Sequence, residues 1–593
     1  EMDTLERPLC AHTSAAGKIL KCALAAFLVL LLYPNLYLLG EPWNHALPEG
    51  AMVGSGRVHV LWVNVLLLVM LFAAVRKAWV AVLVLTPFFA LLPLELFYMS
   101  QFGTPTHAAL LGVLADTDRN EAMSWLGQTG VWVVVASFVA ALAGLILAWF
   151  LKRAQLAWPS GRLRRLLGVW LPLLIGVPLL VTLVFNTVRN SFLDEDQQLQ
   201  KAMAYRMGGL PRAMLISYPA GVPLRVLDFY KYQQAMAVVR HHADGMHFGA
   251  DRPDPLPKQV QREVYVLVIG ESLRADHLQV NGYARETTPH LHAARDLVSF
   301  RDFVSAASVT RHAVPPLFTR RLPDNAAMVK PEPTVLQAFK EAGFKTYWFT
   351  TQAPFGKDDA GISMVLGQAG EVRSVSPEGW RPGVYDGDLL NWVDEVLAKT
   401  DEPRQLIVLH TRGSHAQYSL RYPPAFDYFQ PVAPAGEEVD PWDNRQRASL
   451  INAYDNSVRY TDWFVEQVMQ RIERNTQSQG QGWLMFVSDH GETLFDGQCG
   501  RASHGFASRP NFMPAAFVWP TAAYARFHPQ ALEALRVHAS MPVDYRSVFH
   551  TLLDLADIRV PVYDAELSLA SERFKSHGPR TVSYTHLTLP TIR

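Results

Sequence analysis

Residues 264–272 read VYVLVIGES, an apolar run that ends at Gly270 and is followed directly by Glu271. An unbroken run of valine, isoleucine and tyrosine predicts a β-strand that is buried on both faces, as in a parallel sheet. Ligands of open α/β sheets bind just outside the carboxyl ends of the strands. Glu271 is therefore a candidate for chemistry at such an edge.

Similar short apolar runs recur further along the chain, and helical patterns separate them. The runs are TYWFT, QLIVLH, WLMFVS and AAFVW, and the helical patterns include EPTVLQAFKEAGF and NSVRYTDWFVEQVMQRIE. This alternation predicts an α/β domain in which a mostly parallel sheet lies between helices.

A second strand of this domain also ends in residues that can bind a metal. WLMFVS runs directly into Asp489 and His490. Together with Glu271, these residues would supply carboxylate and imidazole ligands, which suit zinc, with manganese as a weaker alternative.

The amino-terminal part of the chain is apolar enough to cross a membrane. Mean hydropathy over all 593 residues is +0.05, and the excess lies before residue 190. Five runs approach or exceed the length of about 20 residues that a bilayer requires. They are residues 18–39, 59–75, 79–98, 131–151 and 166–185. The sequence therefore predicts a five-helix transmembrane domain.

Lysine and arginine in the short loops predict the orientation of these spans. Arg76 and Lys77 follow the second span, and five basic residues lie between the fourth and the fifth. The first and third loops carry only Arg57 and Arg119. By the positive-inside rule, the amino terminus is cytoplasmic and everything after the fifth span is outside. The first span is expected to be a retained signal-anchor.

The chain divides into four parts on these patterns. Residues 1–187 are the expected transmembrane domain, 188–262 an amphipathic and linker region, and 263–581 the exported α/β domain. Patches such as RVLDFYKYQQAMAVVRHH are either interfacial helices on the membrane or ordinary connecting helices. Residues 582–593, VSYTHLTLPTIR, resemble a translated sequencing adapter, and we expect them to be a non-native tail.

The charge balance and the cysteine content bear on nucleic-acid binding and on disulfide formation. The chain has 54 basic and 54 acidic residues, so nothing indicates a nucleic-acid partner. Its three cysteines are Cys10, Cys22 and Cys499, and only the last lies in the exported half. A disulfide within that domain is therefore excluded.

Several ordered motifs together resemble one known family. They are GESLRADHLQVNGYARETTPHL, SVTRHAVPPLF, LHTRGSHAQYSLRYP, YDNSVRYTDW and VSDHGE. In order and spacing they resemble the membrane phosphoethanolamine transferases, which belong to the alkaline phosphatase and sulfatase superfamily. The resemblance covers nearly the whole chain and implies an alkaline phosphatase-like fold for the periplasmic domain, which is attached to the inner membrane of a Gram-negative cell.

The resemblance assigns roles to individual residues. It implies that Glu271, Thr310, Asp489 and His490 bind a catalytic zinc ion and that Thr310 is the nucleophile. A threonine hydroxyl is a poor nucleophile at neutral pH, and a metal can favour its alkoxide. As a lone residue, Thr310 would be read as a helix cap, and the flanking pattern favours the nucleophile instead.

Other matching positions are expected to contact substrate. His415 and His504 match histidines at the substrate phosphate, where they would stabilise charge and move a proton. Gln352 and Lys357 roughly match a polar residue and a lysine near the donor headgroup. Asp116 falls where the family usually has a glutamate that reaches the substrate amine, and a helix cap is the alternative role for this shorter acid.

One departure from the family pattern bears on the acceptor. Lipid A modifying members have cysteines flanking the nucleophile, whereas this chain has Ala306 and Pro316 at those positions. This cysteine-poor pattern is nearer to members that act on core sugars or periplasmic glucans.

The resemblance implies a specific reaction. The enzyme would transfer phosphoethanolamine from phosphatidylethanolamine to an envelope glycan or lipopolysaccharide acceptor, through a phosphoethanolamine-threonine intermediate. A phosphoglycerol transferase of the lipoteichoic-acid synthase type is one alternative. A noncatalytic lipid-sensing membrane protein on the same fold is another.

Overall fold

A computed structural model describes most of the chain. The described residues are 12–40, 55–102, 105–106, 110–112, 119–204, 212–252, 260–320, 332–352, 362–376, 383–433, 440–496, 500–505 and 508–576. The chain divides into two compact units. The first comprises Glu1–Leu111, Gln128–Gln200 and Arg206–Tyr232, and the second comprises Gly112–Gly127, Lys201–Tyr205 and Gln233–Arg593.

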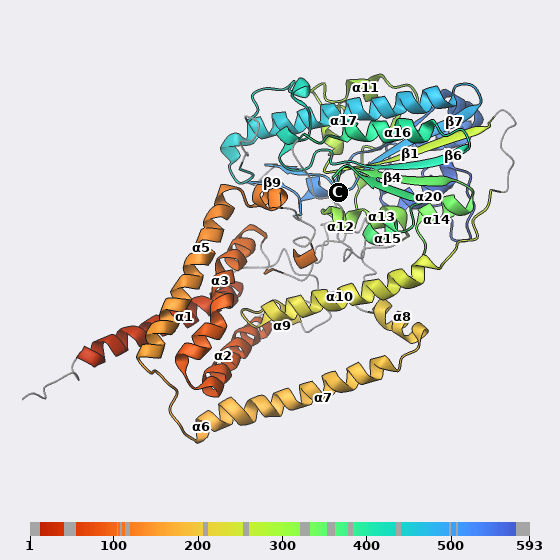
Figure 1. Cartoon of the computed structure of the whole chain (residues 1–593). Helices are drawn as coiled ribbons and strands as arrows, with labels where there is room; N and C mark the ends of the chain where they lie inside the picture. Colours follow the sequence, from red (N-terminus) through yellow and green to blue (C-terminus); the bar gives the residue numbers. More distant parts are fainter. Residues whose placement is uncertain are drawn as a thin grey trace, which may run out of the picture. The chain divides into compact units, whose positions relative to one another are not determined.

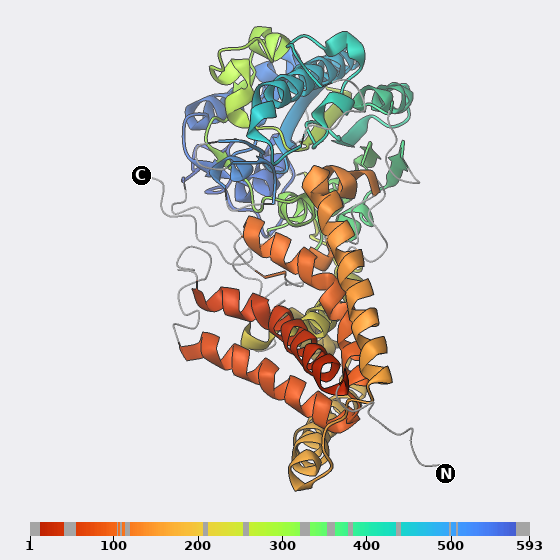
Figure 2. The same cartoon turned by 90° about the vertical axis from the view of Figure 1, so that its left-hand side faces the viewer.

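The first unit is helical over its described residues. Its helices, some of which continue into the second unit, are α1 (His12–Gly40), α2 (Ser55–Val75), α3 (Ala78–Phe102), α5 (Arg119–Arg153), α6 (Arg162–Arg165), the π-helical turn η1 (Leu166–Trp170), α7 (Leu171–Ser191), α8 (Glu195–Ala204), α9 (Arg212–Leu215) and α10 (Gly221–Asp244). Helices α1, α2 and α3 pack against one another and are drawn in red to orange in Figures 1 and 2.

Four stretches of this unit are long and apolar enough to cross a membrane. They are Gly17–Leu38, Ala78–Ser100, Gly130–Arg153 and Arg162–Ser191. The remaining expected span lies in α2, where the apolar segment is the shorter His59–Val75. The unit is therefore a membrane domain with four apolar helices of spanning length, and the expected count of five is not confirmed.

Buried polar side chains of three helices hold the segment that leads into α10. Asn35 Oδ1 in α1 accepts a hydrogen bond from the backbone N–H of Tyr218 at 2.9 Å. Glu95 in α3 pairs through both carboxylate oxygens with Nη1 of Arg225, at 3.0 and 2.9 Å. Since Arg225 is buried, one face of the start of α10 is fixed against these helices, while Val226, Leu227 and Tyr230 of the same helix are exposed.

The second unit contains a seven-stranded sheet in the order β2-β10-β7-β1-β6-β4-β5. The strands are β1 (Arg262–Gly270), β2 (Val298–Ser299), β4 (Lys345–Thr350), β5 (Glu371–Ser374), β6 (Arg404–His410), β7 (Gly480–Ser488) and β10 (Ala516–Pro520). Strand β10 pairs antiparallel with both of its neighbours, β2 and β7, and the other pairs of this sheet are parallel over the described residues. Two short pairs complete the unit: β3 (Phe303–Val304) with β11 (Val543–Asp544), and β8 (Thr493–Leu494) with β9 (Ala502–Ser503). The prediction of a mostly parallel sheet is confirmed.

Helices cover both faces of this sheet (Figure 1). The core on one face includes residues of α16 (Leu390–Leu397) and α17 (Arg447–Thr476), and α11 (Pro289–Ala293) packs against α17. The core on the other face includes residues of α13 (Pro315–Phe318), α14 (Val335–Glu341), α15 (Ile362–Leu366), α18 (Ala522–Phe527), α19 (Pro529–His538) and α20 (Arg546–Leu555). Because both faces are covered, the central strands are continuous apolar runs rather than alternating ones.

The register of the central strands brings three chain segments to one edge. Gly270 at the end of β1 pairs with Ser488 at the end of β7, and Ile269 pairs with His410 at the end of β6. The residues that follow these strands, including Glu271 and Asp489, therefore emerge side by side at the carboxyl edge of the sheet.

Candidate active site

Glu271, Asp489 and His490 form a buried cluster at this edge. Their exposed fractions are 1%, 1% and 0%. One potential ligand atom from each residue lies within 4.8 Å of the other two. The cluster follows from the strand register, because Glu271 leaves β1 and the other two residues leave the neighbouring strand β7.

The ring of His490 is oriented by its own loop. Nδ1 lies 2.8 Å from the carbonyl oxygen of Gly491, so Nδ1 carries the proton and donates it. Nε2 then presents its lone pair to the carboxylates, 3.3 Å from Glu271 Oε1 and 3.3 Å from Asp489 Oδ2. Burial, together with nearby His504, lowers the pKa of His490 to about 4, so the ring is neutral at pH 7. A neutral imidazole fixed in this way is suited to bind a metal.

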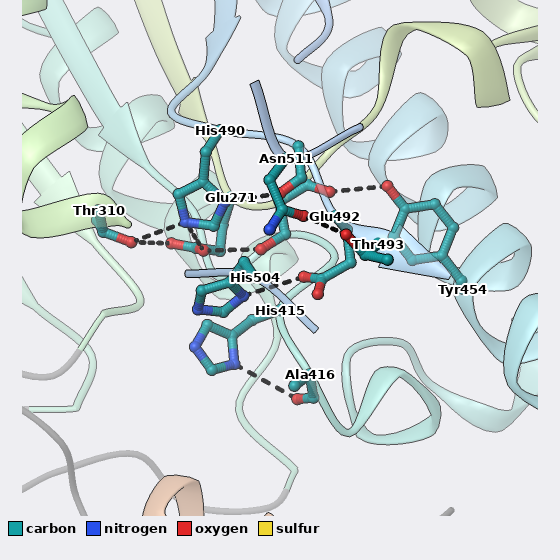
Figure 3. A network of polar contacts seen from close by, with 12 residues as sticks. Glu271, Thr310, His415, Ala416, Tyr454, His490, Glu492, Thr493, His504 and Asn511 are labelled. Atoms are coloured by element: carbon teal, nitrogen blue, oxygen red, sulfur yellow. Dashed lines mark hydrogen bonds and ion pairs between the residues drawn. The ribbon is translucent and has the colours of Figure 1, made fainter. Parts of the chain in front are cut away.

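Thr310 lies against the same cluster, at the start of the short helix α12 (Thr310–Ala313). Its hydroxyl donates a hydrogen bond to Glu271 Oε2 at 3.1 Å and lies 3.4 Å from Nε2 of His490 (Figure 3). The hydroxyl is part-buried, so one side of it can meet a substrate. The structure thus brings together all four residues of the expected zinc site.

The donor set fits a divalent cation. Burial and the charge of Asp489 raise the pKa of Glu271, and burial raises the pKa of Asp489 to about 6. Oδ2 of Asp489 is buried and accepts no hydrogen bond from the described residues. Two buried carboxylates repel each other, and a bound cation would remove that repulsion. Carboxylate and imidazole donors in such a cluster are ligands that zinc accepts.

The loop after β6 is shaped around Glu271. Ser414 N–H donates to the carbonyl oxygen of Glu271 at 3.0 Å. Gly413 has a φ of +46°, and a Cβ atom there would lie 2.9 Å from that same oxygen, so only glycine fits. Asp386 holds the loop from behind by accepting the N–H groups of Arg412 and Gly413 at 2.8 and 3.0 Å.

His504 and His415 lie next to the cluster (Figure 3). The ring of His504 is 4.5 Å from that of His490 and 5.4 Å from that of His415. Burial opposes a charge on His504, but the Glu492 carboxylate, 3.1 Å from Nδ1, together with Glu271 and Asp489, raises the pKa of His504 to about 9. His504 is therefore a cation at neutral pH and can bind an anionic group or donate a proton.

The remaining residues expected at the substrate are Gln352, Lys357 and Asp116. Gln352 is buried and donates from Nε2 to Glu271 Oε2 at 3.0 Å. Lys357 and Asp116 lie outside the described residues. His410, at the end of β6, is fully buried beside Trp348, and burial lowers its pKa to about 3.

Two supporting residues were not assigned a role from the sequence. Glu492 holds His504, and its place in VSDHGE, two residues after His490, was the available signal. Tyr454 of α17 donates to the carbonyl oxygen of Ser272 at 2.7 Å and accepts the N–H of Arg274 at 2.9 Å. It therefore fixes the loop just after Glu271. Tyr454 opens the motif YDNSVRYTDW, but that motif does not indicate Ser272 as its partner.

Comparisons with known proteins agree with this geometry. Residues 263–558 match the Sulfatase family. Phosphoethanolamine transferase EptC of Escherichia coli O18:K1:H7 is 23% identical over 93% of this chain and 90% of its own length. Phosphatidylethanolamine transferase Mcr-1 of Escherichia coli is 26% identical over 78% of this chain and 81% of its own.

One solved structure covers both units. The integral membrane protein lipooligosaccharide phosphoethanolamine transferase A (EptA) from Neisseria meningitidis matches 93% of this chain and 97% of its own, with a TM-score of 0.62 and 21% identity. This likeness shows a shared fold. Residues 263–558 therefore form a catalytic domain of the Sulfatase family, in a chain that resembles the membrane phosphoethanolamine transferases over nearly its whole length.

Proposed function

We propose that this enzyme transfers phosphoethanolamine from phosphatidylethanolamine to a glycan or lipopolysaccharide of the bacterial envelope, with Thr310 as nucleophile. The observation that carries the proposal is the position of the Thr310 hydroxyl, 3.1 Å from Glu271 Oε2 and 3.4 Å from His490 Nε2. A hydroxyl that donates to a carboxylate and lies beside a neutral imidazole has partners that can accept its proton, as a phosphoryl-transfer nucleophile needs.

In the first half-reaction, Oγ1 of Thr310 bonds to the phosphorus of the lipid headgroup. The bond between phosphorus and the glycerol oxygen breaks, and diacylglycerol leaves. The threonine proton passes toward Glu271 Oε2, which already accepts it as a hydrogen bond. His504, with a pKa of about 9, is protonated and suited to give its proton to the leaving oxygen.

In the second half-reaction, an acceptor hydroxyl or phosphate attacks the phosphorus of the phosphoethanolamine-threonine group. The bond between phosphorus and Oγ1 breaks, and Thr310 recovers a proton. His504 can take the proton of an attacking hydroxyl, because it has just lost its own. His415, whose ring lies 5.4 Å from that of His504, would contact the phosphoryl oxygens.

Glu271, Asp489, His490 and Thr310 would hold the metal ion, which we propose to be zinc. Such an ion, when bound, stabilises the negative charge of the threonine oxygen and of the phosphoryl group. Buried carboxylates near one another support this assignment, as does the Nε2 lone pair of His490 that faces them.

The membrane domain supports a lipid donor. Its four apolar helices would hold the enzyme at a bilayer, where the headgroup of phosphatidylethanolamine is available. We propose that the protein lies in the inner membrane, with the amino terminus in the cytoplasm and the catalytic domain in the periplasm. Basic residues near α2 and between α5 and α7 support this orientation.

The decisive experiment looks for the covalent intermediate. The full-length protein, purified in detergent, is incubated with zinc and phosphatidylethanolamine, and the peptide that contains Thr310 is examined by mass spectrometry. We expect a phosphoethanolamine adduct on Thr310, and none in Thr310→Ala. The adduct should reappear in part in Thr310→Ser, which keeps a hydroxyl.

Other outcomes would point to the alternatives. An adduct formed only with phosphatidylglycerol would identify a phosphoglycerol transferase. No adduct with either lipid, in protein that has bound zinc, would contradict the proposal and favour a lipid sensor.

A further inference from the structure

We propose that a second pocket of the catalytic domain binds a neutral sugar ring. This pocket, here called the α11–α17 pocket, is lined by Phe426, Asp427, Tyr428, Arg459, Asp462 and Trp463, together with the start of α11. Its volume is about 440 Å³, which is within the range of small-molecule sites. None of its lining residues belongs to the Thr310 site, so the inference does not depend on the proposed reaction.

The apolar wall of the pocket is rigid. Trp463 stacks on Tyr460 of the same helix, with ring centroids 5.3 Å apart and an angle of 17° between the rings. Phe426 packs against both, at 5.6 and 4.8 Å. Aromatic rings fixed in this way offer a flat surface to the C–H face of a sugar, and they lose little entropy when a ligand binds.

The rim of the pocket carries an exposed aromatic ring and a cation. Tyr428 is 57% exposed, although it is a large apolar side chain. The guanidinium of Arg459 lies 4.1 Å from the centroid of its ring, and Nη1 donates to the carbonyl oxygen of Glu286. Two contacts therefore hold the guanidinium in place, and its other N–H groups can donate to ligand hydroxyls.

Two carboxylates supply hydrogen-bond acceptors. Asp462 is 1% exposed, and its oxygens accept the backbone N–H groups of His290 and Leu291 at 3.0 and 2.9 Å. Each oxygen keeps a further lone pair. Asp427 accepts the hydroxyl of Tyr422 through Oδ1 at 2.9 Å, which leaves Oδ2 for a ligand.

The loop that forms the rim is already in place in the structure. Asn456, which is fully buried, accepts the N–H groups of Tyr428 and Phe429 through Oδ1, at 3.1 and 2.7 Å. Its Nδ2 donates to the carbonyl oxygen of Phe429 at 3.0 Å. Because one side chain satisfies three backbone groups, the pocket needs no ligand to fold.

This combination selects the class of ligand. Asp427 and Asp462 would repel a phosphate or a carboxylate, and Arg459 offsets part of their attraction for an amine. Sugar hydroxyls suit both kinds of group, since each can donate to a carboxylate and accept from a guanidinium. The apolar face of the same ring can pack on Trp463 or Tyr428. A neutral hexose unit therefore fits the pocket better than a charged group does.

The test is a binding measurement on the full-length protein in lipid nanodiscs, free of sugar-based detergent. The probes are maltotriose, glucose 6-phosphate and inorganic phosphate, and saturation-transfer NMR reports binding. We expect maltotriose to bind and its affinity to fall at least about tenfold in Tyr428→Ala and in Arg459→Ala. Two surface variants serve as controls, Val537→Ala at a 51% exposed residue and Arg445→Ala at a 90% exposed side chain.

Three results would overturn the proposal: no maltotriose binding, equal binding by the wild type and both pocket variants, or binding of the phosphate-bearing probes alone. The variant Thr310→Ala should bind maltotriose like the wild type. This separates the pocket from the transferase proposal, because Thr310→Ala tests only the reaction.

Discussion

The side-chain amide of Gln352 donates a hydrogen bond to Glu271 Oε2 at 3.0 Å, and a second to the carbonyl oxygen of Thr411 at 3.0 Å. Gln352 thereby joins the ends of three segments, those that follow β1, β4 and β6. The bond fixes the rotamer of a carboxylate that we propose as a metal ligand. Groups that orient metal ligands in this way contribute strongly to metal affinity.

We therefore predict that Gln352→Ala binds zinc roughly 10- to 100-fold more weakly than the wild type. Competition with a fluorescent zinc chelator measures this. Gln337→Ala is a matched control, because the Gln337 amide also donates to a glutamate, Glu341, but away from the cluster. Equal zinc affinity in Gln352→Ala and wild type would show that Glu271 is held without this amide.

A second prediction concerns Gly491, next to His490. A Cβ atom at this position would lie 2.0 Å from the carbonyl oxygen of Pro510, and neither backbone can move freely. We predict that Gly491→Ala destabilises the catalytic domain by roughly 1–3 kcal/mol. Thermal unfolding followed by circular dichroism measures this.

Gly500→Ala is the control for this change, since a Cβ atom there meets nothing within 4 Å. It should leave the unfolding temperature unchanged. If both glycine variants unfolded at the wild-type temperature, the close approach at Pro510 would not be rigid.

A third prediction concerns pH. His550 of α20 is 2% exposed, accepts the N–H of Asp564 through Nδ1, and has its pKa lowered by burial from 6.5 to about 4. The folded protein therefore binds fewer protons at this residue than the unfolded chain does. Its contribution to stability is present above pH 6.5 and is lost as pH falls toward 4, by up to about 3 kcal/mol.

Denaturant unfolding at pH 7 and pH 5 measures the effect. In His550→Gln the loss of stability between these two pH values should be smaller than in the wild type. His247→Gln should behave like the wild type, because the side chain of His247 is 70% exposed. The same pH dependence in all three proteins would rule out His550 as its source.

A fourth prediction concerns the membrane domain. Arg225→Ala would leave the carboxylate of Glu95 buried without its partner, and we expect a loss of stability of about 3–5 kcal/mol. Thermal unfolding in detergent measures this. The double variant Glu95→Leu/Arg225→Leu should be more stable than Arg225→Ala, because no charge remains buried. A double variant as unstable as the single one would show that the loss of stability comes from lost side-chain packing rather than from an unpaired buried charge.

The sequence predicted the carboxyl edge of the sheet well, because β1 and β7 are short apolar runs that end directly in Glu271 and in Asp489. Such runs are encoded locally, so the strands and the residues after them can be read from the chain. Family resemblance added Thr310, which the apolar pattern alone would not have singled out from a helix cap. Its roles as nucleophile and ligand remain predictions.

Contacts between distant segments could not be predicted in the same way. Glu95 and Arg225 are 130 positions apart, and only their pairing shows that one face of the start of α10 is fixed against α3. The pattern of α10 alone is compatible with a membrane surface as well. The same holds for the link from Tyr454 to Ser272, which depends on how α17 packs on the sheet.

The one-to-one pairing of β1 with β7 also limits how this protein can evolve. Successive residues of a strand face opposite sides of a sheet, so a single codon inserted into or deleted from β7 would turn Asp489 and His490 away from Glu271. Loops around the site can gain or lose residues without this effect. Relatives that differ in acceptor should therefore differ in the lengths of their loops, while the lengths of these two strands stay fixed.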